Sequence, residues 1–440
     1  MNLHIQNGRL IDPANRLDTH QDLFIADGKI VGVGSAPAGF SAGRVIDARG
    51  LVVAPGLIDL AARLREPGFE YKATLESEMD AAMAGGITSL AIPPDTDPVL
   101  DEPGLVEMLC YRAKKLNRAH VYPVGALTIG LKGQQLSEMA ELVEAGCVAF
   151  SQANVPIVDT RVLYRAMLYA ATFGFRLWLQ PIDPHLSRGG VAHDGEVASR
   201  LGLPGIPAAA ETVALYTYLQ LARLTGARLH ITRLSSADSL DHIEQARRDG
   251  VDVTCDVAAH ALHLSDMDIG YFNPHCHVIP PLRSQRDRAA LSKAVAEGRI
   301  NAICSDHTPV DDDAKQAPFS ESEPGTTGLE LLLPLTLKWA AEHKLPLLDA
   351  VARVTSEAAK IAGIAKGGHL SVGARADIYN QLEALAQQGL AILMVSSDMQ
   401  EVLSVSHRIL TMYKGRITGE FSAADATQAR LLHAAAGGEE

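Results

Sequence analysis

Eight short apolar runs rich in β-branched residues recur along the chain, and segments of amphipathic helical pattern separate them. The runs span residues 57–64, 87–94, 120–127, 147–152, 176–181, 228–236, 251–260 and 301–307. Several intervening segments end in glycine, as helices commonly do; they span residues 75–86, 135–146, 210–226 and 237–250. Alternating strands and helices imply parallel strands, and eight repeats predict an α/β fold of the (β/α)8 TIM-type barrel class. An open doubly wound sheet is the alternative.

The segment before the barrel pattern has a different rhythm. Short runs of alternating apolar and polar residues are separated by Asn7-Gly8 and Asp27-Gly28. These dipeptides are turn signals of β-hairpins. A small β-sheet module is therefore expected ahead of the barrel.

Composition and charge exclude several classes of protein. Of the 440 residues, 47% are hydrophobic and 21% are charged, as in an ordinary soluble globular protein. The formal net charge of -13 argues against a nucleic-acid binder and against a basic membrane-surface protein. We see no secretory leader pattern and no apolar run of membrane length. The five cysteines lack C-x-x-C spacing, so free thiols and a cytoplasmic location are expected.

The chemistry of such a barrel lies at the carboxyl ends of its strands. Side chains expected there include Ala61, Arg63, Gln152, Asn154, Gln180, Arg233 and Asp306. A catalytic zinc ion needs about three converging His, Asp, Glu or Cys ligands and an open position for water. Arginine cannot be deprotonated to act as a ligand, and the set holds a single carboxylate. These strand ends are therefore unusual for a metal site.

Six motifs, taken in order, resemble those of the dihydroorotases, which are members of the amidohydrolase superfamily. GLIDLAARLREPG is similar to D-x-H-x-H-x-R-E-P-G, PPDTDPVLD to P-N-T-x-P, LHITRLSS to H-x-x-H-x-S, PPLRS to P-P-L-R, SDHTPV to D-H-x-P-H and GTTGLE to G-x-x-G-L-E. The resemblance runs from residue 1 to about residue 377 and implies a β-sandwich built from both ends of the chain. The expected domains are an N-terminal sandwich part at 1–52, the barrel at 53–355, a return segment to the sandwich at 356–379 and an atypical α/β tail at 380–440.

The departures from the dihydroorotase motifs fall on functional positions. Six positions at which the family has metal ligands hold residues of other types in this chain, namely Ala61, Arg63, Gln152, Ala153, Gln180 and Arg233. Asp306 alone is retained. In the family, a metal-bound hydroxide hydrolyses the ring amide and the strand-eight aspartate shuttles the proton. The resemblance therefore implies that the zinc cofactor is lost and that Asp306 is a vestigial catalytic residue.

The substrate positions implied by the resemblance are also altered. Asp95 replaces the asparagine of P-N-T, Ile279 replaces the asparagine before P-P-L-R, and Val310 replaces the last histidine of D-H-x-P-H. Arg65 and His307 survive. We interpret Arg65, Asp95 and His307 as vestigial substrate-binding residues, and we expect Arg65 to form an ion pair at the barrel mouth.

An erased site on this fold resembles the non-catalytic dihydroorotase homologues of some bacteria. Those proteins associate with the catalytic chain of aspartate carbamoyltransferase and are required for its assembly. The resemblance implies an inactive subunit of pyrimidine biosynthesis, in a hetero-oligomer and a homodimer. One alternative is an active cyclic-amide hydrolase whose metal is absent or relocated to His260, His263, His275 and His277. Another is a non-functional fusion product.

The fusion alternative arises from the tail. Residues 376–421 resemble the C-terminal end of the ATP-binding subunit of bacterial sugar importers, with Ser397 at the position of the switch histidine. No Walker A, signature motif or Walker B precedes this segment, so ATP hydrolysis is not expected. The pattern predicts a helix, a strand, a second helix and a hairpin turning at Lys414-Gly415, packed on the N-terminal β-module.

The two arginines at former ligand positions predict a specific geometry. Loss of metals would leave Asp306 as a lone buried carboxylate, which is costly. Arg63 and Arg233 replace metal ligands, so their side chains should point toward the same space. A guanidinium stays charged and forms forked hydrogen bonds to carboxylates. We therefore predict that Arg63, Arg233 or both reach Asp306 or Asp95.

Overall fold

The computed structural model describes residues 2–376, 408–413, 416–422, 427 and 430–431. The chain divides into two compact units, Met1–Ala376 and Asp377–Glu440. Within the described ranges, every helix is too short or too polar to cross a lipid bilayer.

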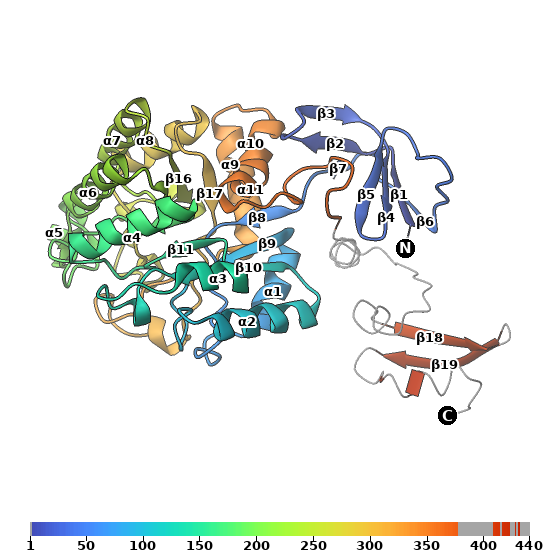
Figure 1. The fold of residues 1–440 in the computed structure, drawn as a ribbon, viewed down its shortest axis with the longest axis horizontal. Coiled ribbons are helices and arrows are strands. Elements are labelled where there is room, and N and C mark those ends of the chain that lie inside the picture. The colour runs from blue at the N-terminus through green and yellow to red at the C-terminus, as the bar shows by residue number, and fades with distance from the viewer. Residues whose placement is uncertain (1, 377–407, 414–415, 423–426, 428–429, 432–440) are drawn as a thin grey trace. The chain divides into compact units, whose positions relative to one another are not determined.

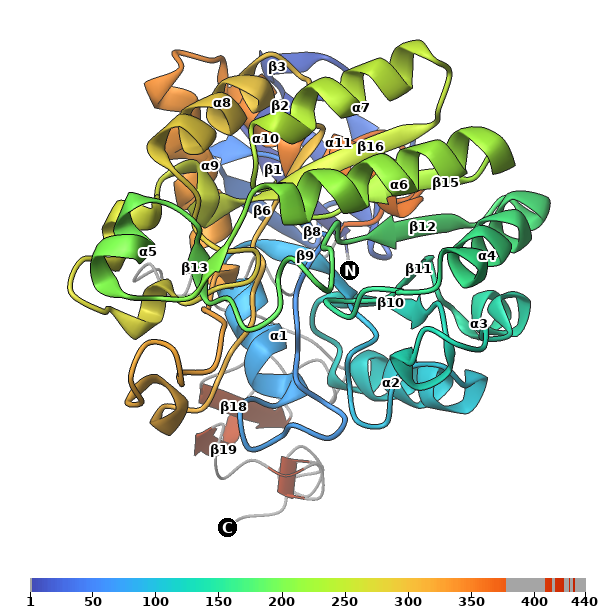
Figure 2. The ribbon, with the colours of Figure 1, turned by 90° about the vertical axis from the view of Figure 1, so that its left-hand side faces the viewer.

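Eight parallel strands form the central sheet of the first unit, in the order β17-β16-β15-β12-β11-β10-β9-β8 (Figures 1 and 2). They are β8 (Leu57–Asp59), β9 (Ile87–Ile92), β10 (His120–Ala126), β11 (Ala149–Ser151), β12 (Arg176–Leu179), β15 (Arg228–Ile231), β16 (Val253–Ala258) and β17 (Ala302–Cys304). Each falls in one of the eight apolar runs. A parallel bridge between Ala62 and His307 joins the two outermost strands just past their carboxyl ends. The barrel prediction is confirmed, and the open doubly wound sheet is wrong.

Helices surround this sheet (Figure 2). They are α1 (Leu75–Ala84), α2 (Pro103–Leu116), α3 (Met139–Ala145), α4 (Thr160–Phe173), α6 (Ala209–Thr225), α7 (Asp238–Arg248), α8 (Gln285–Ala296), α9 (Leu332–Glu342) and α10 (Leu347–Arg353). The four helices expected from the sequence are all present, and α6 shows why. Its buried residues recur every three or four positions, for example Leu215, Tyr218 and Ala222, so one stripe faces the barrel.

The loop after β12 carries a small additional layer. It contains α5 (Glu196–Leu201) and the two-stranded sheet of β13 (Ala192–His193) and β14 (Gly205–Ile206). Apolar side chains of this layer, Ala192, Val197 and Ala198, share a buried cluster with residues of later loops, such as Ile269 and Phe319.

The amino end of the barrel is closed by α11 (Ser356–Ala362), which contacts β8 and β17. One buried cluster joins barrel-lining residues, such as Ile58 and Trp178, to Ala358 and Ile361 of this helix. Apolar side chains therefore fill the barrel interior on the side that faces α11.

The N-terminal module consists of two sheets, with strand orders β5-β4-β1-β6 and β3-β2-β7. The strands are β1 (Asn2–Gln6), β2 (Arg9–Asp12), β3 (Leu17–His20), β4 (Leu23–Ala26), β5 (Lys29–Val33), β6 (Arg44–Asp47) and β7 (Val52–Val53). Asp27 and Gly28 have φ of 50° and 67°, as a two-residue type I′ hairpin turn requires. The Asn7-Gly8 hairpin prediction is wrong, because β1 pairs with β4 and β6. That turn carries the chain from one sheet to the other.

The chain returns to this module after α11. Arg375 forms an antiparallel bridge with Lys29, and the backbone N–H of Ile30 donates to the carbonyl of Ala374 at 3.0 Å. The segment after the barrel thus adds to the edge of β5.

In the second unit, β18 (Arg408–Tyr413) pairs in antiparallel fashion with β19 (Arg416–Ser422), as the hairpin prediction requires. The helix–strand–helix predicted for residues 380–407, with Ser397, and the turn at Lys414-Gly415 lie outside the described residues. The expected packing of the tail on the N-terminal module stays a prediction.

Candidate functional site

Four charged side chains from four strand ends meet at the carboxyl end of the barrel. Arg233, after β15, places Nη1 2.9 Å from Oδ1 of Asp306, after β17. Arg63, after β8, places Nε 2.8 Å from Oδ2 of Asp95, after β9, and Nη1 3.7 Å from Oδ1 of Asp306. The side chains of Arg63, Arg233 and Asp306 are 5%, 5% and 4% exposed. The predicted arginine–carboxylate geometry is confirmed for both arginines.

Neutral groups complete the shell of this four-residue cluster. Nη2 of Arg233 donates to Oδ1 of Asn154 at 2.6 Å. Nη1 of Arg63 donates to Oγ1 of Thr308 at 3.0 Å. Nη2 of Arg63 is buried and has no hydrogen-bond partner within the described part of the chain. The arginines therefore tie the ends of five strands together, because Asn154 follows β11.

Electrostatics favour the charged state of the Arg63–Asp95 pair. Burial alone would lower the pKa of Arg63, but the nearby Asp95 and Asp306 carboxylates outweigh it and raise that pKa. Burial alone would raise the pKa of Asp95, but Arg63 outweighs it and the pKa is lowered. The cluster is thus a network of compensated charges, as buried ions require.

A buried pair beneath the cluster holds the backbone of Arg233. Asp256 accepts the backbone N–H of Arg233 at 2.5 Å and lies 3.0 Å from Nε2 of His230, whose Nδ1 lies 2.9 Å from Oγ1 of Thr254. Arg233 needs this anchor, because its φ of 53° is in the left-handed region that non-glycine residues rarely adopt. Sequence reasoning missed Asp256 and His230, although an aspartate inside an apolar strand run was a usable signal.

The other replaced ligand positions do not converge on this cluster. Gln152 donates Nε2 to Oγ1 of Thr128 and to the carbonyl of Leu131, both at 2.8 Å, so it anchors the loop after β10. Gln180 accepts from Oγ1 of Thr232 at 3.4 Å. Ala61 and Ala153 are buried and carry no donor atom on their side chains.

Arg65 and His307 have structural partners. Nε of Arg65 donates to the carbonyl of Pro309 at 2.7 Å. Among the described residues, Arg65 forms no ion pair, so our expectation of one is wrong. Burial, together with the adjacent Arg63, lowers the pKa of Arg65, and a backbone carbonyl satisfies its N–H without a second buried charge. His307 pairs through Nε2 with Glu78 of α1, and its Nδ1 accepts the N–H of Gly328 at 3.1 Å.

The four histidines considered for a relocated metal site do not form one. Nε2 of His263 lies 2.9 Å from the carbonyl of Leu335, and Nδ1 of His277 lies 3.0 Å from Oγ of Ser322. His275 is exposed, and burial lowers the pKa of His260. Across the described ranges, no group of three or more His, Cys, Asp or Glu side chains is placed to hold a metal ion.

The strand ends therefore do not fit the zinc that dihydroorotase chemistry uses. Among the positions at which the family has metal ligands, Asp306 is the one that holds a side chain able to bind a metal. The guanidiniums of Arg63 and Arg233 both face its Oδ1. Replacing a metal by guanidinium keeps the positive charge but supplies neither an open coordination position nor a Lewis acid.

The barrel, its strand-end cluster and the β-module define a TIM-type barrel protein with the amidohydrolase fold. The L-hydantoinase (dihydropyrimidinase) from Arthrobacter aurescens superposes with a TM-score of 0.75 at 24% identity, covering 85% of each chain. The family model "Dihydro-orotase-like" matches residues 50–239.

The chain belongs to the dihydroorotase-like family. It is 47% identical over 378 residues to a "Dihydroorotase-like protein" of Pseudomonas aeruginosa, covering 86% of this chain and 89% of the relative. It is 39% identical over 378 residues to a "Dihydroorotase" of Geobacter sp. (strain M21), with the same coverage of 86% and 89%.

The donor set leads to a prediction about metal content. We expect elemental analysis of the purified chain to show less than one zinc per chain, even after incubation with zinc and desalting, because amides and guanidiniums replace the ligands. A zinc-binding protein carried through the same desalting step serves as the control. Stoichiometric zinc that survives desalting would contradict this expectation and direct attention back to the four histidines.

Proposed function

We propose that this chain is a catalytically inactive dihydroorotase-like subunit of de novo pyrimidine biosynthesis, located in the cytoplasm, that scaffolds the aspartate carbamoyltransferase complex. The observation that supports inactivity is the contact of Arg233, at 2.9 Å, and of Arg63, at 3.7 Å, with Oδ1 of Asp306. Proton shuttling by an aspartate requires a reacting water at hydrogen-bond distance. Here guanidiniums occupy the space beside that oxygen.

The substrate side of the site supports the same conclusion. Nε of Arg65 donates to the carbonyl of Pro309, and His307 is paired with Glu78. Asp95 presents a carboxylate where the family has a neutral amide, and that carboxylate is engaged by Arg63. An anionic ring substrate such as dihydroorotate would meet the carboxylate of Asp95 and a histidine, His307, that is already paired with Glu78.

The scaffold role rests on the resemblance to the non-catalytic homologues together with an intact fold. A bridge between Ala62 and His307 joins the outermost strands of the barrel, and Arg63, Arg233, Asp95 and Asp306 form a charge network at the strand ends. A scaffold subunit requires a folded surface but no catalytic centre. The proposed partner is the catalytic chain of aspartate carbamoyltransferase, in a hetero-oligomer that contains a dimer of this chain.

Co-purification tests the scaffold role directly. We expect the tagged full-length chain to retain the catalytic chain of aspartate carbamoyltransferase from the same organism, and the mixture to elute as one species whose mass by light scattering accounts for both chains. A tagged catalytic dihydroorotase of another bacterium is the matched control and should elute separately. Separate elution of the two chains at micromolar concentration, or purification of this chain only as aggregate, would contradict the proposal.

A further inference from the structure

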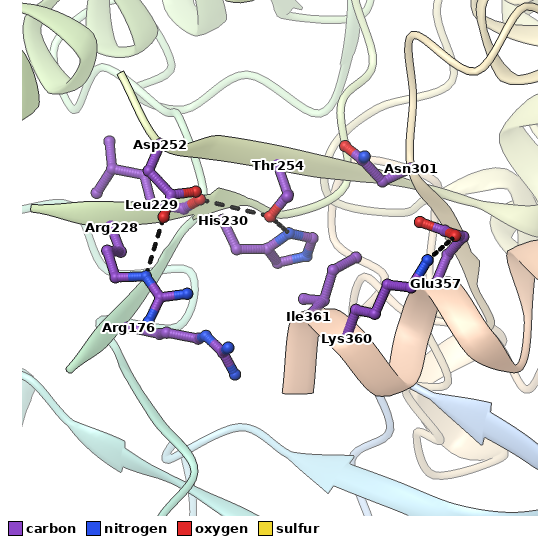
Figure 3. Close-up of a pocket in the computed structure, with 10 residues that line it drawn as sticks. All are labelled: Arg176, Arg228, Leu229, His230, Asp252, Thr254, Asn301, Glu357, Lys360 and Ile361. Carbon is purple, nitrogen blue, oxygen red and sulfur yellow. Dashed lines mark hydrogen bonds and ion pairs between the residues drawn. The ribbon is translucent and has the colours of Figure 1, made fainter. Parts of the chain in front are cut away.

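A pocket of about 140 Å³ lies at the amino end of the barrel, opposite the strand-end cluster (Figure 3). The first residues of β12 and β15, the start of β16 and one face of α11 line it. The polar side chains that matter here are Arg176, Arg228, Asp252, Asn301, Glu357 and Lys360.

The charges in this pocket are not balanced. Arg228 pairs with Asp252 at 2.9 Å, and Lys360 of α11 pairs with Glu357 at 2.7 Å. Arg176 has neither a hydrogen bond nor an ion pair from its side chain to any residue that the structure describes. The three cations therefore face two carboxylates, both already engaged, and the unpaired positive charge is that of Arg176.

Strand register brings the two guanidiniums together. Arg176 and Arg228 are paired positions on the adjacent parallel strands β12 and β15. Figure 3 shows both on the strand side of the pocket, with Lys360 across from them on α11 and its ammonium turned toward Glu357. Burial, and then the charge of Arg228, lower the pKa of Arg176, and the Asp252 carboxylate offsets them only in part. A partly buried guanidinium next to a like charge is costly unless an anion joins it.

One neutral donor also lines the pocket. Oδ1 of Asn301 accepts from the backbone N–H of Cys255 at 3.0 Å and from Nη2 of Arg247 at 2.8 Å, which leaves the amide Nδ2 as its free donor. Guanidiniums bind oxyanions through two parallel N–H bonds, and two of them side by side form a fork for one phosphate or carboxylate.

From these contacts we infer that the pocket binds a small oxyanion, carried by a phosphate or a carboxylate group, between Arg176 and Arg228, with Lys360 at its rim. The site is separate from the strand-end cluster. The oxyanion would bind whether or not the chain assembles with aspartate carbamoyltransferase. A negative result in the binding test therefore leaves the proposed scaffold role untouched, and the reverse is also true.

Isothermal titration of the full chain with inorganic phosphate, and separately with succinate, tests the site at constant ionic strength. We expect saturable 1:1 binding of at least one probe, and the tighter probe identifies the source of the oxyanion. Arg176→Gln should weaken that binding about tenfold or more, because a charge-assisted hydrogen bond is lost. Arg228→Gln, at a more exposed position, should do the same if the first variant folds poorly.

Arg165→Gln is the matched control, because Arg165 is an exposed arginine on α4, outside the pocket lining. It should leave the affinity unchanged. Absence of saturable binding of both probes, or equal affinity in the native chain and in both pocket variants, would overturn the inference.

Discussion

Arg233→Met is expected to lower the free energy of unfolding by about 3–5 kcal/mol, because it leaves a buried carboxylate without its main partner. Nη1 of Arg233 is 2.9 Å from Asp306, whereas the remaining cation, Arg63, is 3.7 Å away. The amide oxygen of Asn154 also loses its donor. Methionine keeps the alkyl stem and carries a Cβ, so packing and the strained φ of 53° are largely unchanged. Urea denaturation measures the loss.

Two controls separate the ion pair from other effects. Arg165→Met on α4 changes an exposed arginine and should stay within about 0.5 kcal/mol of the native chain. The double variant Arg233→Met with Asp306→Leu removes both charges and should recover most of the loss, since buried pairs are often replaceable by apolar groups. A single Arg233→Met variant as stable as the native chain would show that this pair does not hold the barrel mouth together.

The barrel was predictable because its signal is local and repeated. The run at residues 87–94, for example, carries β-branched side chains and is largely buried on both faces, and a helix such as α6 has one apolar stripe. The Asn7-Gly8 turn was misread because the dipeptide specifies a tight turn but not the partner of the next strand. Pairing of β1 with β4 and β6 is a long-range choice that the dipeptide cannot encode.

The charge cluster was predictable for a different reason. Arg63 and Arg233 stand at two positions whose ligands converge in the family, and their long charged side chains both reach Asp306. Gln152 and Gln180 are uncharged and bond other groups instead. The partner of Arg65 was not predictable in this way, because a backbone carbonyl has no sequence signature. The Glu78 partner of His307 was missed as well, since it comes from a helix and not from a strand end.

The oxyanion pocket gave no sequence signal at all. Arg176, Arg228 and Lys360 are far apart in the chain and belong to no shared motif. Their proximity follows from the register of β12 against β15 and from the docking of α11 under the barrel. Such sites at the amino ends of strands are read only from the three-dimensional arrangement.

The measurement that bears most directly on the replacement of metal by guanidinium is dihydroorotate hydrolysis by the purified full-length chain, with and without added zinc. An active bacterial dihydroorotase is assayed alongside as the positive control. We expect no turnover above the buffer rate in either condition, because Arg63 and Arg233 engage Asp306 and supply no activated water. Turnover that rises with zinc and disappears with a chelator would contradict the loss of catalysis.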